Sequence, residues 1–250
     1  MTLELAARAF EVLLGWSLLL QSLEQLRVQA IDRVGDWSIQ RDEVPRFPRG
    51  LLPLLDRLFQ PGPYRAMLVL RALLAVALMA GLLPAAGAVA LFVIALALLL
   101  RWRGAFNGGS DFMTLVGLTG LLLAHAAGWR AGLWWVTLQA LSSYFVSGWV
   151  KLLRAEWRTG RALPFFLDSG VYGPLPAGSL FRHPRVAQAC AWAFTLWEGC
   201  FPLALLDSRL AAAFCAVAAT FHFLVFWFFG LNRFFWAWMT TYPAILYAAS

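Results

Sequence analysis

Long apolar segments separated by short polar ones run through the whole chain, and they limit the possible folds more than any other feature. A transmembrane helix needs about 20 mostly apolar residues to cross a hydrocarbon core of about 30 Å. Such segments occupy residues 5–23, 66–83, 85–100, 112–128, 133–150, 187–206, 210–229 and 234–249. The pattern predicts an all-α, polytopic membrane bundle of about eight transmembrane helices. We expect residues 1–250 to form a single integral membrane domain.

The composition excludes the other broad classes of protein. Hydrophobic residues make up 61% of the chain and charged residues 13%, whereas soluble domains average about 45–50% and about 25%. The period-two alternation of a membrane β-barrel is missing. The three cysteines, Cys190, Cys200 and Cys215, lie in apolar stretches without metal-ligand spacing, so we expect free thiols and no metal site. The first segment lacks a positive leader and a small-residue cleavage site, and we expect it to be retained as a helix.

The basic residues are distributed very unevenly around these segments. With eight alternating spans, one side of the membrane receives the loops 24–65, 101–111, 151–186 and 230–233, which hold 16 of the 20 basic residues. The other side holds Arg8, Arg130 and Arg209. By the positive-inside rule the basic side is cytoplasmic, so we expect a bacterial-type inner membrane protein with both termini outside. The net charge of +7 then reflects topology and attraction to membrane lipids, and it does not indicate nucleic-acid binding.

Two of the expected cytoplasmic loops, 24–65 and 154–186, are long. Within the first, residues 51–59 are apolar with a small charged face, which fits either an interfacial helix or a plain connector. The second is rich in aromatic residues and contains five arginines. We expect it to pack on the membrane face or to dip back into the bundle, and it is the place where a partner protein would dock.

A few polar side chains fall at membrane depth, where each is a functional candidate because of its insertion cost. Arg71 lies within reach of the cytoplasmic interface, so it either snorkels there or contributes to binding. Glu198 is too deep to snorkel and should be protonated or paired, with His222 or Arg71 as the expected partners. His222 lies among phenylalanines, and we expect a neutral, buried side chain that is hydrogen-bonded across helices. The chain shows no phosphate-binding loop, HExxH or GxSxG motif.

Lys151 is the only lysine, against 19 arginines. An arginine keeps its proton at ordinary pH, whereas a lysine removed from water can act as a base. The alternative is an interfacial cation for which arginine would serve equally well. A base needs shielding from water, and Trp149, Trp157 and the aromatic residues of 165–181 are available for it. A neighbouring carboxylate, Glu156 or Asp168, would instead create a structural ion pair.

The residues around Lys151 resemble a known family. Residues 144–152 (YFVSGWVKL), followed by Glu156, Trp157, Gly160 and Ala162, resemble a recurring stretch of the HTTM (horizontally transferred transmembrane) proteins. These are related to the membrane part of vitamin K-dependent γ-glutamyl carboxylases. Further similar stretches are residues 106–111 (FNGGSD), Glu198 with Pro202 and Arg209, and His222 with Gly230 and Phe234. The resemblance covers roughly residues 65–245.

The resemblance implies a role for Lys151 as the base that deprotonates a reduced quinone, so the implied cofactor or substrate is a quinone-like lipid. The candidate catalytic residues are then Lys151, Glu198 and His222, and the candidate substrate-binding residues are Trp149, Trp157, Asn107 and Arg71. The carboxylases have two adjacent lysines where this chain has Val150 and Lys151. The 250 residues hold no counterpart of the large lumenal domain, so we expect carboxylase- or epoxidase-like chemistry rather than γ-carboxylation itself.

Two classes of function remain open at this point. The first is a membrane-embedded enzyme with Lys151 as base and a lipid-soluble substrate in the bundle. The second is a non-catalytic membrane subunit whose aromatic cytoplasmic loops dock or scaffold a partner protein. A transporter is the third interpretation, and no repeated half with broken helices supports it.

Overall fold

A computed structural model describes residues 1–31, 37, 41, 50–102, 108–170 and 173–250. Every regular element in these ranges is helical and none is a strand, which confirms the all-α prediction. Four helices in the described ranges are long and apolar enough to cross a membrane. They are α4 (Pro61–Met79), α5 (Ala85–Trp102), the part Gly109–Ala127 of α6 (Gly108–Ala127), and α11 (Ser208–Phe229).

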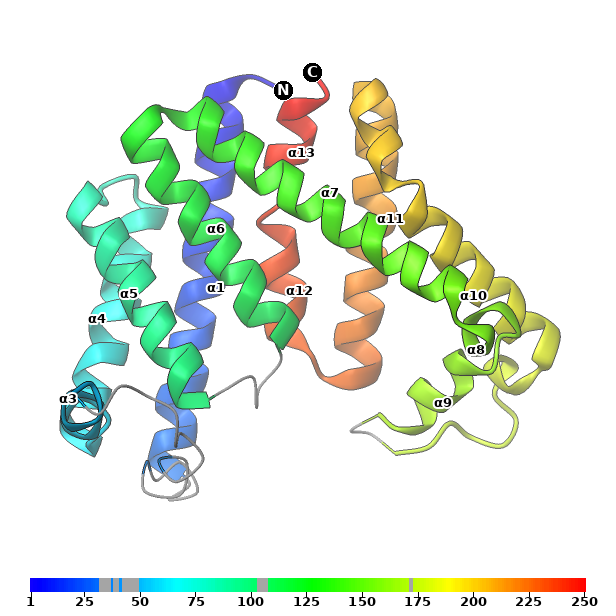
Figure 1. Cartoon of the computed structure of the whole chain (residues 1–250), viewed down its shortest axis with the longest axis horizontal. Coiled ribbons are helices and arrows are strands. Elements are labelled where there is room, and N and C mark those ends of the chain that lie inside the picture. The colour runs from blue at the N-terminus through cyan, green and yellow to red at the C-terminus, as the bar shows by residue number, and fades with distance from the viewer. Residues whose placement is uncertain (32–36, 38–40, 42–49, 103–107, 171–172) are drawn as a thin grey trace.

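The helices form two groups joined by one long oblique helix (Figure 1). In the first group, α1 (Leu3–Ile31) packs along α4, and α5 packs against α6. Helix α7 (Trp129–Leu153) starts against α6 and runs obliquely to α10 (Pro184–Gly199) in the second group. Helices α12 (Asn232–Met239) and α13 (Tyr242–Ala248) lie beside α1, and the two chain termini meet at one end of the bundle.

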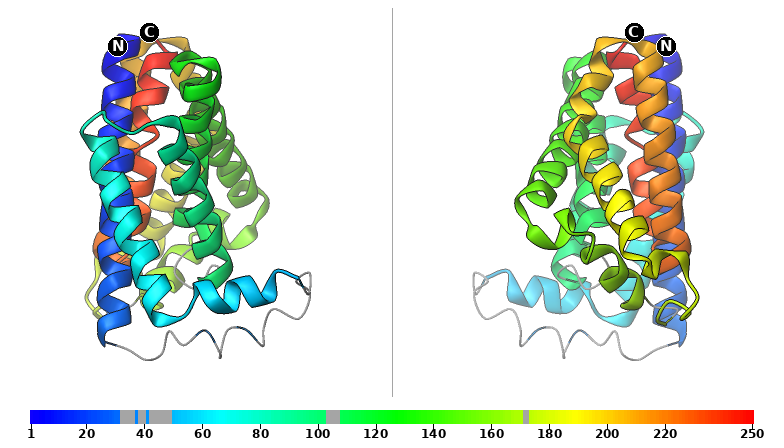
Figure 2. Two further views of the ribbon diagram at one scale, coloured as in Figure 1. Left: turned by 90° about the vertical axis from the view of Figure 1, so that its left-hand side faces the viewer. Right: turned by 90° about the vertical axis from the view of Figure 1, so that its right-hand side faces the viewer.

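Short helices gather at the end of the bundle opposite the termini (Figure 1). Helix α3 (Leu52–Leu58) lies across the bundle axis, as Figure 2 shows, and contacts α4. The segment 51–59 is therefore helical rather than a plain connector. Helices α8 (Ala155–Arg158) and α9 (Ala162–Asp168) and the 3-10 turn η2 (Leu180–Arg182) pack against α10. The described part of the loop 154–186 is thus folded, as its aromatic content predicts.

Two of the expected spans are broken helices. Residues 187–206 comprise the end of α10 and a 3-10 helix, η3 (Phe201–Leu206), with a proline in its first turn. Residues 234–249 comprise α12 and α13, which are separated at Thr240 and Thr241, and α13 also begins at a proline. A proline fits the first turn of a helix but cannot donate the hydrogen bond of a helix interior. The prolines therefore restart each segment in a new direction.

The core consists of three clusters of apolar side chains. One joins α1, α4, α5, α6 and α7, the second joins α7, η3, α11, α12 and α13, and the third joins α3 to α4 and α5. Large apolar residues also point outward, among them Leu73, Val93 and Trp227. Helices that are apolar on the outer as well as the inner face are typical of proteins surrounded by lipid.

Candidate functional site

Helix α7 presents Tyr144, Ser147 and Lys151 on one side because residues three, four and seven apart share a helix face. The neighbouring helix α10 comes very close at this level. A Cβ atom added to Gly148 would lie 2.2 Å from the backbone nitrogen of Gly199. The absence of a side chain at Gly148 therefore permits the crossing that brings Glu198 of α10 opposite the polar face of α7.

The three polar side chains at this crossing are joined by direct contacts. Lys151 Nζ forms an ion pair with Glu198 Oε2 and also donates a hydrogen bond of 2.6 Å to Ser147 Oγ. Ser147 Oγ in turn donates to Glu198 Oε2 at 3.1 Å. The side chain of Lys151 is 14% exposed and that of Glu198 is 4% exposed. Together they form a closed polar triad between α7 and α10.

This geometry decides several expectations about Lys151 and Glu198. Glu198 faces the bundle and bonds to a neighbouring helix, as predicted, but its partner is Lys151; the expectation of His222 or Arg71 is wrong. Glu156 is exposed, and Asp168 pairs with Arg182 at 2.7 Å, so neither is the carboxylate beside the amine. The interpretation of Lys151 as a solvated interfacial cation is also wrong, because its charge is matched inside the protein.

An aromatic side chain covers the amine on its remaining side. The ring centroid of Trp157 lies 5.1 Å from Lys151 Nζ, and the ring stacks on Phe166 at 5.8 Å between centroids. Trp157 is also part of an open pocket of about 510 Å³ lined by Arg154, Glu156, Trp157, Arg161, Ala162, Phe165 and Phe166. The indole therefore separates this pocket from the amine, in agreement with its expected role as a wall.

Trp149 does not take part in this wall. Its side chain is 48% exposed and packs on Phe145. Residues two positions apart point to different sides of a helix, so Trp149 and Lys151 do not share a face. The expectation that Trp149 shields the Lys151 amine is wrong, and its role in substrate binding stays a prediction. Asn107 lies outside the described residues.

His222 belongs to a second polar group, whose member on α7, Tyr144, lies two turns before Lys151. Tyr144 Oη and His222 Nε2 are 2.8 Å apart, and Tyr144 Oη and Tyr242 Oη are 3.4 Å apart. His222 is 1% exposed, and Trp238 stacks on its ring at 4.8 Å between centroids. The expectation of a buried histidine that bonds across helices is met. Its hydrogen bond goes to Tyr144, so the structure does not bring it to Lys151.

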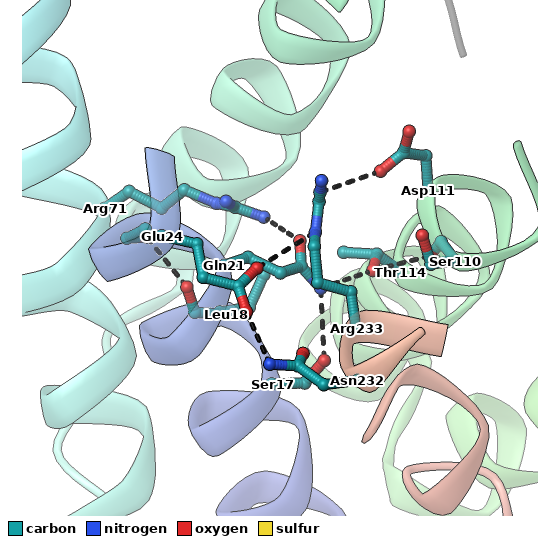
Figure 3. Close-up of polar contacts among 11 residues, drawn as sticks. Ser17, Leu18, Gln21, Glu24, Arg71, Ser110, Asp111, Thr114, Asn232 and Arg233 are labelled. Carbon is teal, nitrogen blue, oxygen red and sulfur yellow. Dashed lines mark hydrogen bonds and ion pairs between the residues drawn. The ribbon is translucent and has the colours of Figure 1, made fainter. Parts of the chain in front are cut away.

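Arg71 of α4 belongs to a third group, which it forms with residues of α1, α6 and α12 (Figure 3). It is only 2% exposed, and its Nη2 donates to Gln21 Oε1 of α1 at 2.8 Å. The snorkelling interpretation is therefore wrong, because the side chain ends inside the bundle. In the same group Arg233 of α12 pairs with Asp111 of α6 at 3.0 Å and with Glu24 of α1 at 3.8 Å. Arg71 and Lys151 thus occupy separate sites.

Several residues of these groups are missing from the sequence-based candidates. Ser147 and Tyr144 share a helix face with Lys151, and this spacing is visible in the sequence. The sequence pattern does not mark Gln21 or Arg233 as part of a site. Gln21 lies at the end of an apolar stretch, and Arg233 lies in a short segment that the pattern predicts to be a loop. In the described part of the chain, Cys190, Cys200 and Cys215 are free, and no cluster of three or more His, Cys, Asp or Glu side chains offers a metal site.

The fold and its apolar helices define the chain as an α-helical membrane protein. Comparisons with protein-family models, with curated proteins and with solved structures gave no match. Arguments about its activity therefore rest on the geometry of the polar groups and on the family resemblance of the sequence.

Proposed function

We propose that the chain is a membrane-embedded enzyme of the HTTM and vitamin K-dependent carboxylase-like class, in which Lys151 acts as base on a quinone-like, lipid-soluble substrate. The observation that carries the proposal is the triad of Lys151, Glu198 and Ser147. A lysine and a glutamate are rare at membrane depth and mark proton-transfer sites when they are paired and turned inward. The single lysine of the chain, 14% exposed and matched by a carboxylate, meets this description.

The direct contact between amine and carboxylate gives Lys151 a route to its neutral form. In a setting of low polarity, a proton shared by the two groups can rest on Glu198 Oε2, because burial disfavours both charged forms. Lys151 Nζ is then a neutral amine, and its electron pair becomes available to the substrate when the O–H of Glu198 turns away from it. It takes the hydroxyl proton of the reduced quinone, which leaves an ammonium ion beside a quinol oxyanion. Ser147 keeps the side chains of Lys151 and Glu198 in position through its hydrogen bonds to both.

The pocket outside Trp157 supports a flat, apolar substrate. Its volume of about 510 Å³ fits a molecule of drug size, and Trp157, Phe165 and Phe166 offer aromatic faces for stacking. Arg154 and Arg161 lie at its rim and would hold polar oxygen atoms. Access from this pocket to the amine requires the Trp157 side chain to turn away.

A non-catalytic subunit is the second candidate, and one observation favours it. Trp157 closes the amine off from the pocket, so the Lys151–Glu198 pair also fits a purely structural role that fixes α7 against α10. The folded loop then becomes the functional part, because Phe165 is 68% exposed at its surface and would contact a partner protein. We rank this candidate below the enzyme because a structural role does not need a lysine.

Purification in mild detergent followed by solvent extraction and mass spectrometry distinguishes the two candidates. The enzyme predicts a quinone-like lipid in about equimolar amount, and its loss in Phe166→Ala, which removes one face of the pocket. Phe145→Ala, on the outer face of α7, is the matched control and should retain the lipid. Absence of any such lipid together with a stoichiometric protein partner would favour the subunit.

For the topology we propose eight crossings, with α10–η3 and α12–α13 each crossing as a broken helix. Support comes from the two termini at one end of the bundle and the segment 154–186, which holds five arginines, at the other, where α8 and α9 lie (Figure 1). The basic end is cytoplasmic under the positive-inside rule. In a cysteine-free variant in intact cells, Ser208→Cys should react with an impermeant thiol reagent and Ser169→Cys should not. Labelling of Ser169→Cys from outside would contradict this orientation.

A further inference from the structure

The buried guanidinium of Arg71 lacks the partners that an arginine normally has. Its Nη2 donates to Gln21 Oε1 at 2.8 Å, whereas Nε and Nη1 have no hydrogen-bond partner among the described residues. The side chain is 2% exposed, so bulk water does not replace them. Arginine keeps its charge even when buried, and unpaired buried N–H groups are costly. The protein therefore presents free, positively charged donors inside the bundle.

These donors line a small, partly enclosed cavity. It has a volume of about 20 Å³, and Arg71, Asp111 and Arg233 contribute its charged walls, while Leu98 and Leu99 of α5 contribute apolar ones. A space of this size accommodates one water molecule or one monatomic ion. A phosphate, a sulfate or a lipid headgroup is too large.

The charges around the cavity are paired unevenly, because the two carboxylates of the group, Asp111 and Glu24, both contact Arg233. Two guanidiniums and one carboxylate line it, and the carboxylate of Asp111 is engaged by Arg233 at 3.0 Å. Figure 3 shows Arg233 between Glu24 and Asp111, while Arg71 reaches only the neutral amide of Gln21. Among the described residues, Arg71 thus has no directly bound counter-charge. An unmatched charge at this depth is strongly unfavourable.

We propose that this cavity binds a small monovalent anion of the halide class, which accepts hydrogen bonds from Nε and Nη1 of Arg71. A water molecule would also satisfy these donors, with Gln25 Oε1 as an acceptor for one of its protons. It would leave Arg71 without a directly bound counter-charge, however, whereas a halide supplies both the acceptor and the charge. The polarisable ion also suits the apolar wall from α5. The bound anion would tie α4 to α1, α6 and α12 at the basic end of the bundle.

Halide-dependent stability of the full chain in mild detergent tests this site. Sodium bromide should replace sodium gluconate at constant ionic strength while the tryptophan fluorescence reports thermal unfolding. We expect a saturable rise of the unfolding temperature by about 3–6 °C when bromide exceeds its dissociation constant tenfold. Arg71→Gln should abolish the rise, and Arg130→Gln, exposed at the other end of the bundle, should retain it. A rise that persists in Arg71→Gln, or equal stability in the two salts, would overturn the proposal.

A diffraction experiment on the unmodified chain keeps the proposal testable if Arg71→Gln does not fold. Crystals grown in bromide should give an anomalous peak within hydrogen-bond distance of Arg71 Nε or Nη1. Density at that position without an anomalous signal would identify an ordered water only, and would overturn the anion site.

Discussion

Two basic side chains inside the bundle, Lys151 and Arg71, are accommodated in opposite ways. Lys151 meets a carboxylate, a hydroxyl and an aromatic ring, so its charge and its donors are matched within the protein. Arg71 meets one neutral amide, two of its nitrogens have no partner among the described residues, and the side chain lines a cavity. The charge of a buried cation can therefore be matched by groups of its own chain. Alternatively, its unpaired donors can bind a ligand from solution. We propose that the first arrangement serves proton transfer and the second serves anion binding.

Removing the carboxylate from the Lys151 site should produce the largest effect, because Lys151 would then be an unmatched cation like Arg71. Glu198→Leu should lower the free energy of unfolding by about 3–5 kcal/mol. Lys151→Met combined with Glu198→Leu should recover most of this loss, since an apolar pair replaces the buried charges. Chemical unfolding in detergent measures both variants. Equal destabilisation in the single and double variants would show that the two side chains do not interact.

A substitution that moves α7 and α10 apart should also separate Lys151 from Glu198, without changing either side chain. Gly148→Ala places a methyl group 2.2 Å from the Gly199 nitrogen and should cost about 2–3 kcal/mol as α7 and α10 move apart. Gly199→Ala is the matched control at the same crossing, because a Cβ atom at Gly199 meets nothing within 4 Å. Thermal unfolding of the two variants gives the comparison. Similar losses in both would mean that the crossing is not closest at Gly148.

The His222 group shares α7 with the Lys151 site, and a smaller change tests whether the two are independent. Tyr144→Phe removes the hydroxyl that bonds to His222 Nε2 and should cost about 1–2 kcal/mol. Because the hydrogen bond of His222 does not reach Lys151, this loss should add to that of Lys151→Met within about 0.5 kcal/mol. Unfolding of the double variant measures the sum. A coupling free energy well above 0.5 kcal/mol would show that the His222 group and the Lys151 site act as one unit.

The smallest effect on stability is expected from an exposed ion pair, which can be compared with the buried pair of Lys151 and Glu198. Arg41 Nε and Nη2 contact the two oxygens of Asp56 at 2.7 and 2.9 Å, and Trp37 Nε1 donates to Oδ1 at 2.7 Å. The hydrogen bonds from Arg41, and then from Trp37, lower the pKa of Asp56 below its ordinary value of 3.8. The stabilisation is therefore present above the pKa of the unfolded chain and disappears as the pH falls through the lowered pKa.

Hydrogen exchange of the α3 backbone amides over a pH series can detect this small effect. Protection of α3 should decrease at acid pH in the unmodified chain, after correction for intrinsic exchange rates. Asp56→Asn should remove the pH dependence while it keeps an acceptor for Trp37. If the pH dependence persists in Asp56→Asn, a titratable group other than Asp56 causes it.

The overall helical character follows from the sequence because segment length and apolar content are local properties. The partner of Glu198 does not, since it depends on how closely α7 and α10 cross, and Gly148 alone does not reveal where its neighbour lies. Arg233 illustrates another limit. The sequence places it in a loop between two apolar segments, yet it lies in the first turn of α12 and pairs with Asp111. A charged side chain near a helix end points inward when it forms an ion pair with a residue of another helix. The sequence does not specify which residue that is.

The central claim is that the Lys151–Glu198 pair takes a proton from a reduced quinone. The most direct test is the absorbance spectrum of a reduced naphthoquinone added without oxygen to the chain in lipid nanodiscs at neutral pH. The account predicts the band of the quinol anion with the unmodified chain. It predicts only the neutral quinol with Lys151→Arg, whose guanidinium keeps its proton, although extraction should recover the same amount of bound quinol from both. A neutral quinol spectrum with the unmodified chain, or an equal anion band with both, would contradict the claim.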